Sequence, residues 1–233
     1  MSTTPDTTPD TKADAIKRLN AELLACAQHG LYAEAEKALL DGADVNARDD
    51  YQWTPLIWAA AGGHTGVAHL LVKHGADIEA ADTNQQTALM NAAYHGRTEV
   101  AQLLIEHAAI PHRRDEHGWT ALMFSAYAEN AQIALDLLKC GAGIDEQDKS
   151  GKTCLMRSAQ RNLVEPARLL LERGADLAIR DNDGNTALDL ATINSHHVVT
   201  GIIRREQDRR AMVQMDGADG ADSEDAAGAP SMG

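Results

Sequence analysis

The fold is decided by residues 49–81, which read DDYQWTPLIWAAAGGHTGVAHLLVKHGADIEAA. The key residues of this stretch recur at intervals of 33 residues along the 233-residue chain. Three series keep the interval without a slip: Asp49, Asp82, Asp115, Asp148 and Asp181; Thr54, Thr87, Thr120, Thr153 and Thr186; Leu56, Leu89, Leu122, Leu155 and Leu188. A Gly-Ala pair keeps the same spacing at Gly42, Gly75, Gly141 and Gly174 but is replaced at Ala108. Repetition of this kind predicts a solenoid of stacked units.

Each unit is predicted to contain two short helices. Thr54 supplies an N-cap oxygen for an Ala-rich helix over 55–61, whose first residue is a proline, where a missing N–H is harmless. A turn at Gly63 leads to a Leu-rich helix around 67–72. That helix ends at Gly75, because glycine adopts the left-handed C-cap conformation at little cost. Small alanines in the first helix allow the second to approach closely.

The runs Thr54-Pro55-Leu56 and Gly42-Ala43-Asp44-Val45-Asn46 resemble the ankyrin repeat. The resemblance covers about residues 16–206. It implies an all-α ankyrin-repeat solenoid of stacked helix-turn-helix units, with β-hairpin-like fingers projecting from one edge. About six repeats are expected, the two terminal caps included.

The ankyrin-repeat domain is expected over residues 14–206. Its expected units are an N-terminal cap (16–48), four repeats (49–81, 82–114, 115–147 and 148–180) and a C-terminal cap (181–206). Residues 1–13 and the acidic, Gly/Ala/Asp-rich residues 207–233 have no apolar periodicity, so both segments are expected to be disordered.

Several positions depart from the repeat pattern. Glu129 and Asn162 stand where the turn glycine is expected, and asparagine tolerates that conformation far better than glutamate. Pro166 falls in the first turn of its helix, where it does no harm. Ala108 replaces a C-cap glycine and Pro111 follows it, which predicts a distorted finger after the third unit.

Composition excludes several classes of function. The chain has 21 Lys and Arg against 35 Asp and Glu, a formal net charge of −14, which opposes binding to nucleic acids and to anionic membranes. No apolar run is long enough to span a bilayer, and the first residues do not resemble a secretory signal. The three cysteines lack C-x-x-C spacing, as expected of free thiols. A cytoplasmic protein is expected.

Catalytic and ligand-binding motifs are weak. Residues 62–66 are glycine-rich but lack the context of a phosphate loop, and we interpret them as an inter-helix turn. His64, His69 and His74 recur every five residues, a spacing that puts them on different helix faces. We therefore expect no enzyme, no cofactor and no bound metal. A small-ligand or metal receptor and, less favoured, a hydrolase in the groove are the alternatives.

Most aromatic residues occupy positions of the repeat that are predicted to face away from the core. In a stacked unit, the residues four, seven and eight positions after the Thr lie on the face of the first helix opposite its Leu and Ala residues. The residue directly before the Thr lies on a finger. In ankyrin-like proteins these phases line the concave surface, formed by the fingers and the first helices. The residues proposed to bind there are Tyr51, Trp53, Trp58, Tyr94, His95, Trp119, Phe124 and Tyr127. The alternative, strongest for Trp58 and Phe124, is that some rings merely cover neighbouring units.

One end of this surface is cationic. The unit 148–180 presents Lys149, Lys152, Arg157 and Arg161, of which the last three are proposed to steer and orient a partner. The alternative is a solvated face with surface salt bridges of little value. The predicted function is a non-enzymatic protein-protein interaction module, acting as an adaptor, scaffold or inhibitor. Its expected partner is a protein with an apolar anchor and an acidic flank, bound by a monomer.

Overall fold

The computed structural model describes residues 12–221, in which twelve α-helices and no strands are found. The helices are α1 (Lys12–His29), α2 (Tyr32–Leu40), α3 (Pro55–Gly62), α4 (Thr65–Lys73), α5 (Ala88–Tyr94), α6 (Thr98–Glu106), α7 (Ala121–Tyr127), α8 (Ala131–Lys139), α9 (Cys154–Arg161), α10 (Val164–Glu172), α11 (Ala187–Ile193) and α12 (His197–Ala221). The predicted all-α repeat solenoid is confirmed.

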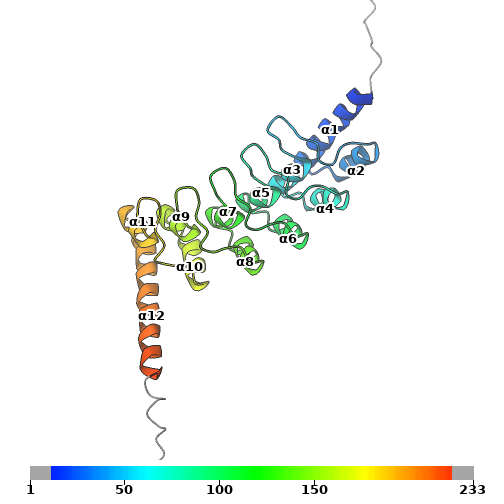
Figure 1. Cartoon of the computed structure of the whole chain (residues 1–233). Coiled ribbons are helices and arrows are strands. Elements are labelled where there is room, and N and C mark those ends of the chain that lie inside the picture. Colours follow the sequence, from blue (N-terminus) through cyan, green and yellow to red (C-terminus); the bar gives the residue numbers. More distant parts are fainter. Residues whose placement is uncertain (1–11, 222–233) are drawn as a thin grey trace, which may run out of the picture.

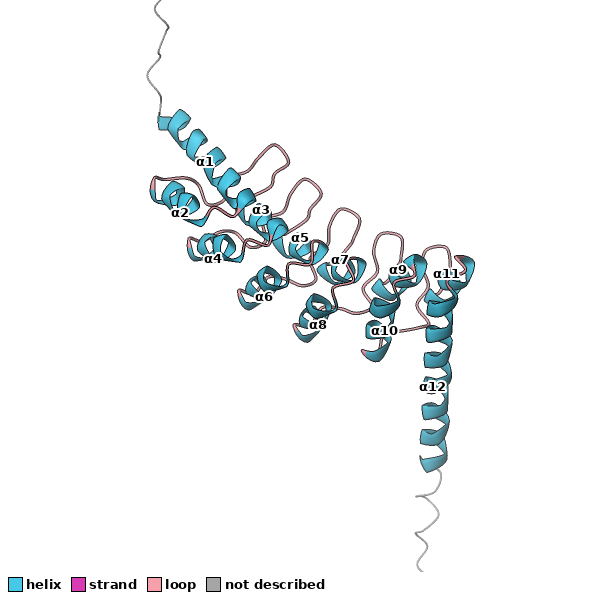
Figure 2. Cartoon of the chain, turned by 180° about the vertical axis from the view of Figure 1, so that it is seen from behind, coloured by secondary structure: helices cyan, strands magenta, loops and turns pink. Residues whose placement is uncertain are grey.

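The helices form two rows along the molecule (Figures 1 and 2). The odd-numbered helices pack on one another in sequence from α1 to α11, and the even-numbered helices form a second row beside them. The long loops before α3, α5, α7, α9 and α11 project as fingers beside the odd-numbered row (Figure 1). The residues that the sequence predicts to bind, on the fingers and on the first helix of each unit, are therefore brought onto one face.

Helix starts follow the threonine series. Thr54 accepts a hydrogen bond from the Ile57 N–H at 3.3 Å, which satisfies one of the free donors of α3. The threonines before α5, α7, α9 and α11 cap their helices in the same way. Their Leu and Ala side chains fill a continuous core, in which Leu56, Leu89 and Leu122 are buried.

Each finger is held by the aspartate that precedes it. Asp49 Oδ1 accepts from the N–H groups of Tyr51 and Trp53, both at 2.9 Å, and Asp115 Oδ1 accepts from those of His117 and Trp119. Neighbouring fingers are also joined by backbone hydrogen bonds, such as that from Thr83 N–H to Tyr51 O at 3.2 Å. The fingers are therefore ordered turns.

The finger after the third unit does not show the predicted distortion at its start. Ala108 adopts the left-handed conformation of the glycine it replaces, with φ +64°. The N–H of Ala109 bonds to Leu104 O at 3.0 Å, the bond that Ala76 makes to Leu71 after α4. Ala108 thus closes α6 in the same manner as glycine, at the cost of a strained backbone.

Both expected domain ends need correction. α1 begins at Lys12, inside the segment 1–13 that was expected to be disordered, and residues 1–11 lie outside the described range. α12 continues to Ala221, beyond the expected end at residue 206, and residues 222–233 lie outside the described range. Part of the extension of α12 is anchored by polar contacts, because Arg210 donates to the carbonyls of Leu171 and Ala175 and pairs with Glu206. These Arg210 contacts are polar, so the apolar periodicity of the sequence does not predict them.

Candidate functional site

The largest ring cluster on the concave surface spans two units. Tyr94 at the end of α5 stacks on Tyr127 of α7, with ring centroids 5.8 Å apart and planes 17° apart. Trp119, on the finger before α7, lies 6.0 Å from Tyr127 and 5.2 Å from Phe124. Tyr94 also meets the Phe124 ring edge-on at 5.9 Å. We call these four residues the ring cluster.

A second aromatic group lies two units earlier along the face. Trp53 and Trp58 pack at 4.4 Å, and the Trp58 indole Nε1–H donates to Asp49 Oδ2 at 3.0 Å. Tyr51, on the same finger, is 70% exposed. The finger of the unit 82–114 carries Gln86 where the fingers of its neighbours carry tryptophan, although the same unit contributes Tyr94 to the ring cluster. That substitution divides the aromatic surface in two.

Phe124 differs from its sequence expectation as a direct anchor. Its side chain is only 7% exposed, because Trp119 and Tyr94 cover it. Trp119 and Tyr127 are half-buried, and Tyr94 is 45% exposed. Phe124 therefore supports the rings above it and offers little contact area of its own.

Two arginines extend the ring cluster. The Arg161 guanidinium carbon lies 4.4 Å from the centre of the Tyr127 ring, and Arg161 is exposed. The Arg157 guanidinium lies 5.3 Å from the centre of the Trp119 ring. Arg157 Nε also donates to Asp148 Oδ2 at 2.6 Å, and its NH2 group donates to Ser150 Oγ at 2.8 Å. Both cations lie over aromatic faces, and Arg157 is in addition held by Asp148 and Ser150.

The cationic end carries less free charge than the sequence suggests. Lys152 differs from its expected role in steering, because it is only 8% exposed and its Nζ lies 3.1 Å from Asp181 Oδ2. Arg157 is neutralised by Asp148. Lys149 and Arg161 are the exposed cations of the four. The buried pairs fix geometry, whereas the two exposed charges remain available to a partner.

Ionisation of the two paired aspartates follows from these contacts. Burial alone would raise the pKa of Asp148, but hydrogen bonds from Arg157, the Lys152 N–H and Ser150 outweigh it and hold the pKa below its usual value. For Asp181, burial is likewise outweighed by the Asn185 N–H and Lys152, and its pKa is lowered. Both carboxylates are therefore charged at neutral pH.

His95 follows Tyr94 and meets its ring edge-on at 4.9 Å. Burial and, secondly, the nearby Arg97 charge lower the pKa of the His95 imidazole. The ring is neutral at pH 7 and adds contact area without adding charge.

A shallow hollow next to the cluster, between two fingers, is lined by His117, Trp119, Lys149, Ser150 and Arg157.

The finger aspartates are positioning residues that sequence reasoning missed. Each one holds the backbone of the residue that precedes the threonine, as Asp115 does for Trp119 at 2.7 Å. The signal was present, since an Asp stands four residues before every such position. These residues position the site without contacting a partner themselves.

Residues 12–221 contain no group of three His, Cys, Asp and Glu side chains placed as metal ligands. None of their helices is long and apolar enough to cross a membrane. Cys154 is buried, which raises its pKa to about 12, so its thiol stays protonated at neutral pH.

Stacked helix pairs with ordered fingers and one ring-bearing face define a repeat protein with an open binding surface. A family model described as ankyrin repeats (3 copies) matches residues 11–82, 79–145 and 122–211. The chain belongs to the ankyrin repeat family, as predicted. The predicted count of about six repeats exceeds the three in that description. No curated protein matches the chain. Ankyrin repeats are generally protein-protein interaction modules and typically not enzymes.

Proposed function

We propose that this chain is a non-enzymatic interaction module that binds a partner protein on its concave surface, as an adaptor, scaffold or inhibitor. The observation that carries the proposal is the ring cluster with Arg157 and Arg161 over its rings. Trp, Tyr and Arg are the residues that most often dominate binding energy at protein interfaces. Here they are contiguous, and both Tyr94 and Arg161 are exposed.

Rigidity supports the same proposal. The rings are held by one another, and the Trp119 backbone is held by Asp115. A surface that is already ordered loses little conformational entropy when a partner binds. The Trp53–Trp58 pair with the exposed Tyr51 supplies a second contact region on the same face.

The partner's chemistry follows from the side chains that remain available. Tyr94, Tyr127 and Trp119 suit an apolar anchor, because their half-exposed rings surround a buried phenylalanine. Arg161 and Lys149 are exposed at one end of the cluster and suit acidic residues beside that anchor. Electrostatic complementarity of this kind raises the association rate and sets orientation more than it adds affinity.

We further propose that the protein acts in the cytoplasm as a monomer. In the described range the three cysteines are free thiols, and two of them, Cys26 and Cys154, are buried. That state fits a reducing compartment. A buried Cys154 with a raised pKa also does not fit a catalytic nucleophile.

The test compares two tyrosines of similar exposure on different surfaces. Tyr94 is 45% exposed in the ring cluster, and Tyr32 is 47% exposed on α2. A partner captured by the wild-type chain and identified by mass spectrometry is titrated against Tyr94→Ala, Trp119→Ala, Arg161→Glu and Tyr32→Ala. We expect the three concave variants to weaken binding at least about tenfold, since hot-spot side chains contribute ~2 kcal/mol or more.

Tyr32→Ala is the matched control and should bind as the wild type does. Circular dichroism of every variant checks that helicity is kept. The proposal fails if a partner of the folded wild type binds all three concave variants with unchanged affinity.

A further inference from the structure

Three departures from the repeat pattern fall at the junction between the units 115–147 and 148–180. The first is a missing hydrogen bond. At four other junctions, the residue that follows the inter-helix turn donates to a carbonyl of the preceding unit: His64 to Gln28 O (3.0 Å), Arg97 to Ala61 O (3.1 Å), Asn130 to Gly96 O (3.4 Å) and His196 to Ala159 O (2.9 Å). The corresponding residue here is Leu163, whose side chain has no donor.

The second departure is Pro166. At the same position of the second helix, four other units carry a β-branched residue that is buried in the core: Val67, Val100, Ile133 and Val199. The proline ring is tied back to its own backbone nitrogen, so it does not reach into the space that valine or isoleucine fills. Pro166 is itself buried, and it lines a hollow between the start of α10 and the preceding unit.

The third departure is Glu129, which has φ +54° in the turn where the earlier units have glycine. A Cβ at Gly63 would lie 2.8 Å from Arg97 Cδ, and one at Gly30 would lie 2.5 Å from His64 Nδ1. The bridging side chain of the next unit thus crowds the turn at these two positions, although Asn162, with φ +60°, is accommodated in the turn that His196 bridges. Where Leu163 replaces that bridging side chain, the turn admits Glu129 in spite of its strained backbone.

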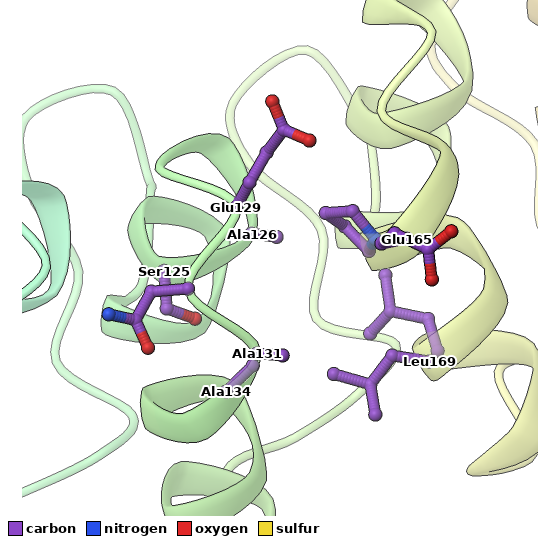
Figure 3. Close-up of a pocket in the computed structure, with 10 residues that line it drawn as sticks. Ser125, Ala126, Glu129, Ala131, Ala134, Glu165 and Leu169 are labelled. Atoms are coloured by element: carbon purple, nitrogen blue, oxygen red, sulfur yellow. The ribbon is translucent and has the colours of Figure 1, made fainter. Parts of the chain in front are cut away.

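Together these residues open an apolar cleft, here called the junction cleft (Figure 3). It is lined by Ser125, Ala126, Glu129, Asn130, Ala131, Ala134, Glu165, Pro166, Leu169 and Leu170, and its volume is only about 20 Å³, so it is a shallow hollow. Leu169 points across it toward Ala131 and Ala134 (Figure 3). Its walls are therefore made of small and aliphatic side chains.

The polar groups of the cleft are already engaged, apart from two carboxylates. Ser125 Oγ donates to Leu122 O at 2.8 Å, and the Asn130 side chain bonds to Gly96 O and the Ile133 N–H. Glu129 and Glu165 are both exposed beside the apolar walls. Glu165 has only a loose, solvent-exposed ion pair with Arg168, at 3.8 Å. The cleft is thus apolar inside and negative at its mouth.

We propose that the junction cleft is a second docking site, which takes the end of one aliphatic side chain of a partner protein with a Lys or Arg beside it. The apolar walls select the side chain, and Glu129 and Glu165 select the cation. This preference is opposite to that of the cationic end of the concave surface, where Arg161 and Lys149 suit acidic residues. The site stands apart from the concave surface and does not depend on its having a partner.

The matched control is a chain in which the junction is rebuilt on the pattern of the other units. Glu129→Gly, Leu163→His and Pro166→Val together restore the glycine, the bridging donor and the buried valine. This variant is expected to fold at least as stably as the wild type, because each change removes strain or fills space. Loss of binding in it therefore reports on the cleft.

The experiment is selection of a phage-displayed library of random peptides on the full-length chain, with the rebuilt variant as counter-target. We expect enriched peptides to carry Leu, Ile or Met next to Lys or Arg. Their dissociation constants should be at least tenfold weaker for the rebuilt variant and several-fold weaker for Glu129→Gln. Arg161→Glu should leave them unchanged, which separates this site from the concave surface.

Location is read from backbone amide shifts of Ala131, Ala134 and Leu169 on titration with an enriched peptide. The proposal is overturned if no peptide distinguishes the wild type from the rebuilt variant, or if the distinguishing peptides carry Asp or Glu beside the apolar residue. It is also overturned if the same amides shift with protein concentration alone, since a second copy would then fill the cleft.

Discussion

Asp148 shows how one residue links the fold to the binding face. Its Oδ1 accepts from the N–H groups of Ser150 and Lys152, which forms the finger. Its Oδ2 receives Arg157, whose guanidinium lies over Trp119 of the preceding unit. A carboxylate that is itself fully covered therefore determines where a cation is placed on the concave surface.

Asp148→Asn should destabilise the chain at pH 7, because the amide can still form the finger but no longer pairs with Arg157. The expected loss is ~1–3 kcal/mol, typical of a buried hydrogen bond to a charged group. Asp148 has a lowered pKa when folded, so its contribution is fully present above the unfolded-state value of 3.8 and is lost as the pH falls below it. The difference between variant and wild type should therefore shrink in acid.

Urea unfolding of both chains at pH 7 and near pH 3 measures this difference. Asp115→Asn is the matched control, since Asp115 forms the same finger but receives on its Oδ2 only the Gln86 amide at 3.5 Å. Equal losses in the two variants would show that the Arg157 pair adds nothing.

At the scale of the element, α12 shows why a composition-based boundary was wrong. Residues after 206 lack apolar periodicity, which suggested disorder. Glu206, however, bonds to both Arg209 and Arg210, and Arg210 reaches the last carbonyls of α10. Cations at a helix C-terminus satisfy carbonyls that have no partner within the helix.

Glu206→Gln should loosen α12 at neutral pH and make its stability less sensitive to acid. Hydrogen bonds from Arg209 come first among the causes that lower the pKa of Glu206 from 4.5 to about 2, and those from Arg210 add to them against the effect of burial. The stabilisation is present above pH 4.5 and is lost toward pH 2. Hydrogen exchange of α12 amides between these pH values, with base-catalysed exchange corrected, measures the effect. A wild-type profile as flat as the variant's would contradict it.

At the scale of the whole molecule, the weakest interface is expected at the junction cleft. A solenoid has the stability of its units plus that of their nearest-neighbour interfaces, so one poor interface divides it into two cooperative parts. All three tryptophans, Trp53, Trp58 and Trp119, lie before this junction, whereas helices lie on both sides of it.

Unfolding in urea should therefore differ between the two probes. We expect the transitions followed by tryptophan fluorescence and by ellipticity at 222 nm not to coincide in the wild type. In the chain with Glu129→Gly, Leu163→His and Pro166→Val, the restored interface should bring the two transitions together. Coincident curves in the wild type would show that the junction is as strong as its neighbours.

The stack could be predicted from sequence because it depends on local rules repeated every 33 residues. Thr54 caps a helix and Gly63 closes one wherever they recur, so the spacing alone determines the architecture. The state of the binding residues could not be predicted so directly. Whether Lys152 is exposed or paired with Asp181, and whether Phe124 lies above or below Trp119, depends on the neighbouring unit. The position of a residue within one repeat does not show which side chains of the neighbouring unit it contacts.

The junction cleft bears on the way the array bends. At this same junction the fingers are still joined, since the Lys149 N–H bonds to His117 O at 3.0 Å. One margin of the interface is thus hinged, while the opposite margin lacks its bridge. We therefore expect thermal bending at this point to be a rotation about the finger margin, which would widen the gap between Ala131 and Leu169. The curvature of the solenoid can then change there while the stacked rings of Tyr94 and Tyr127, within the preceding units, keep their spacing.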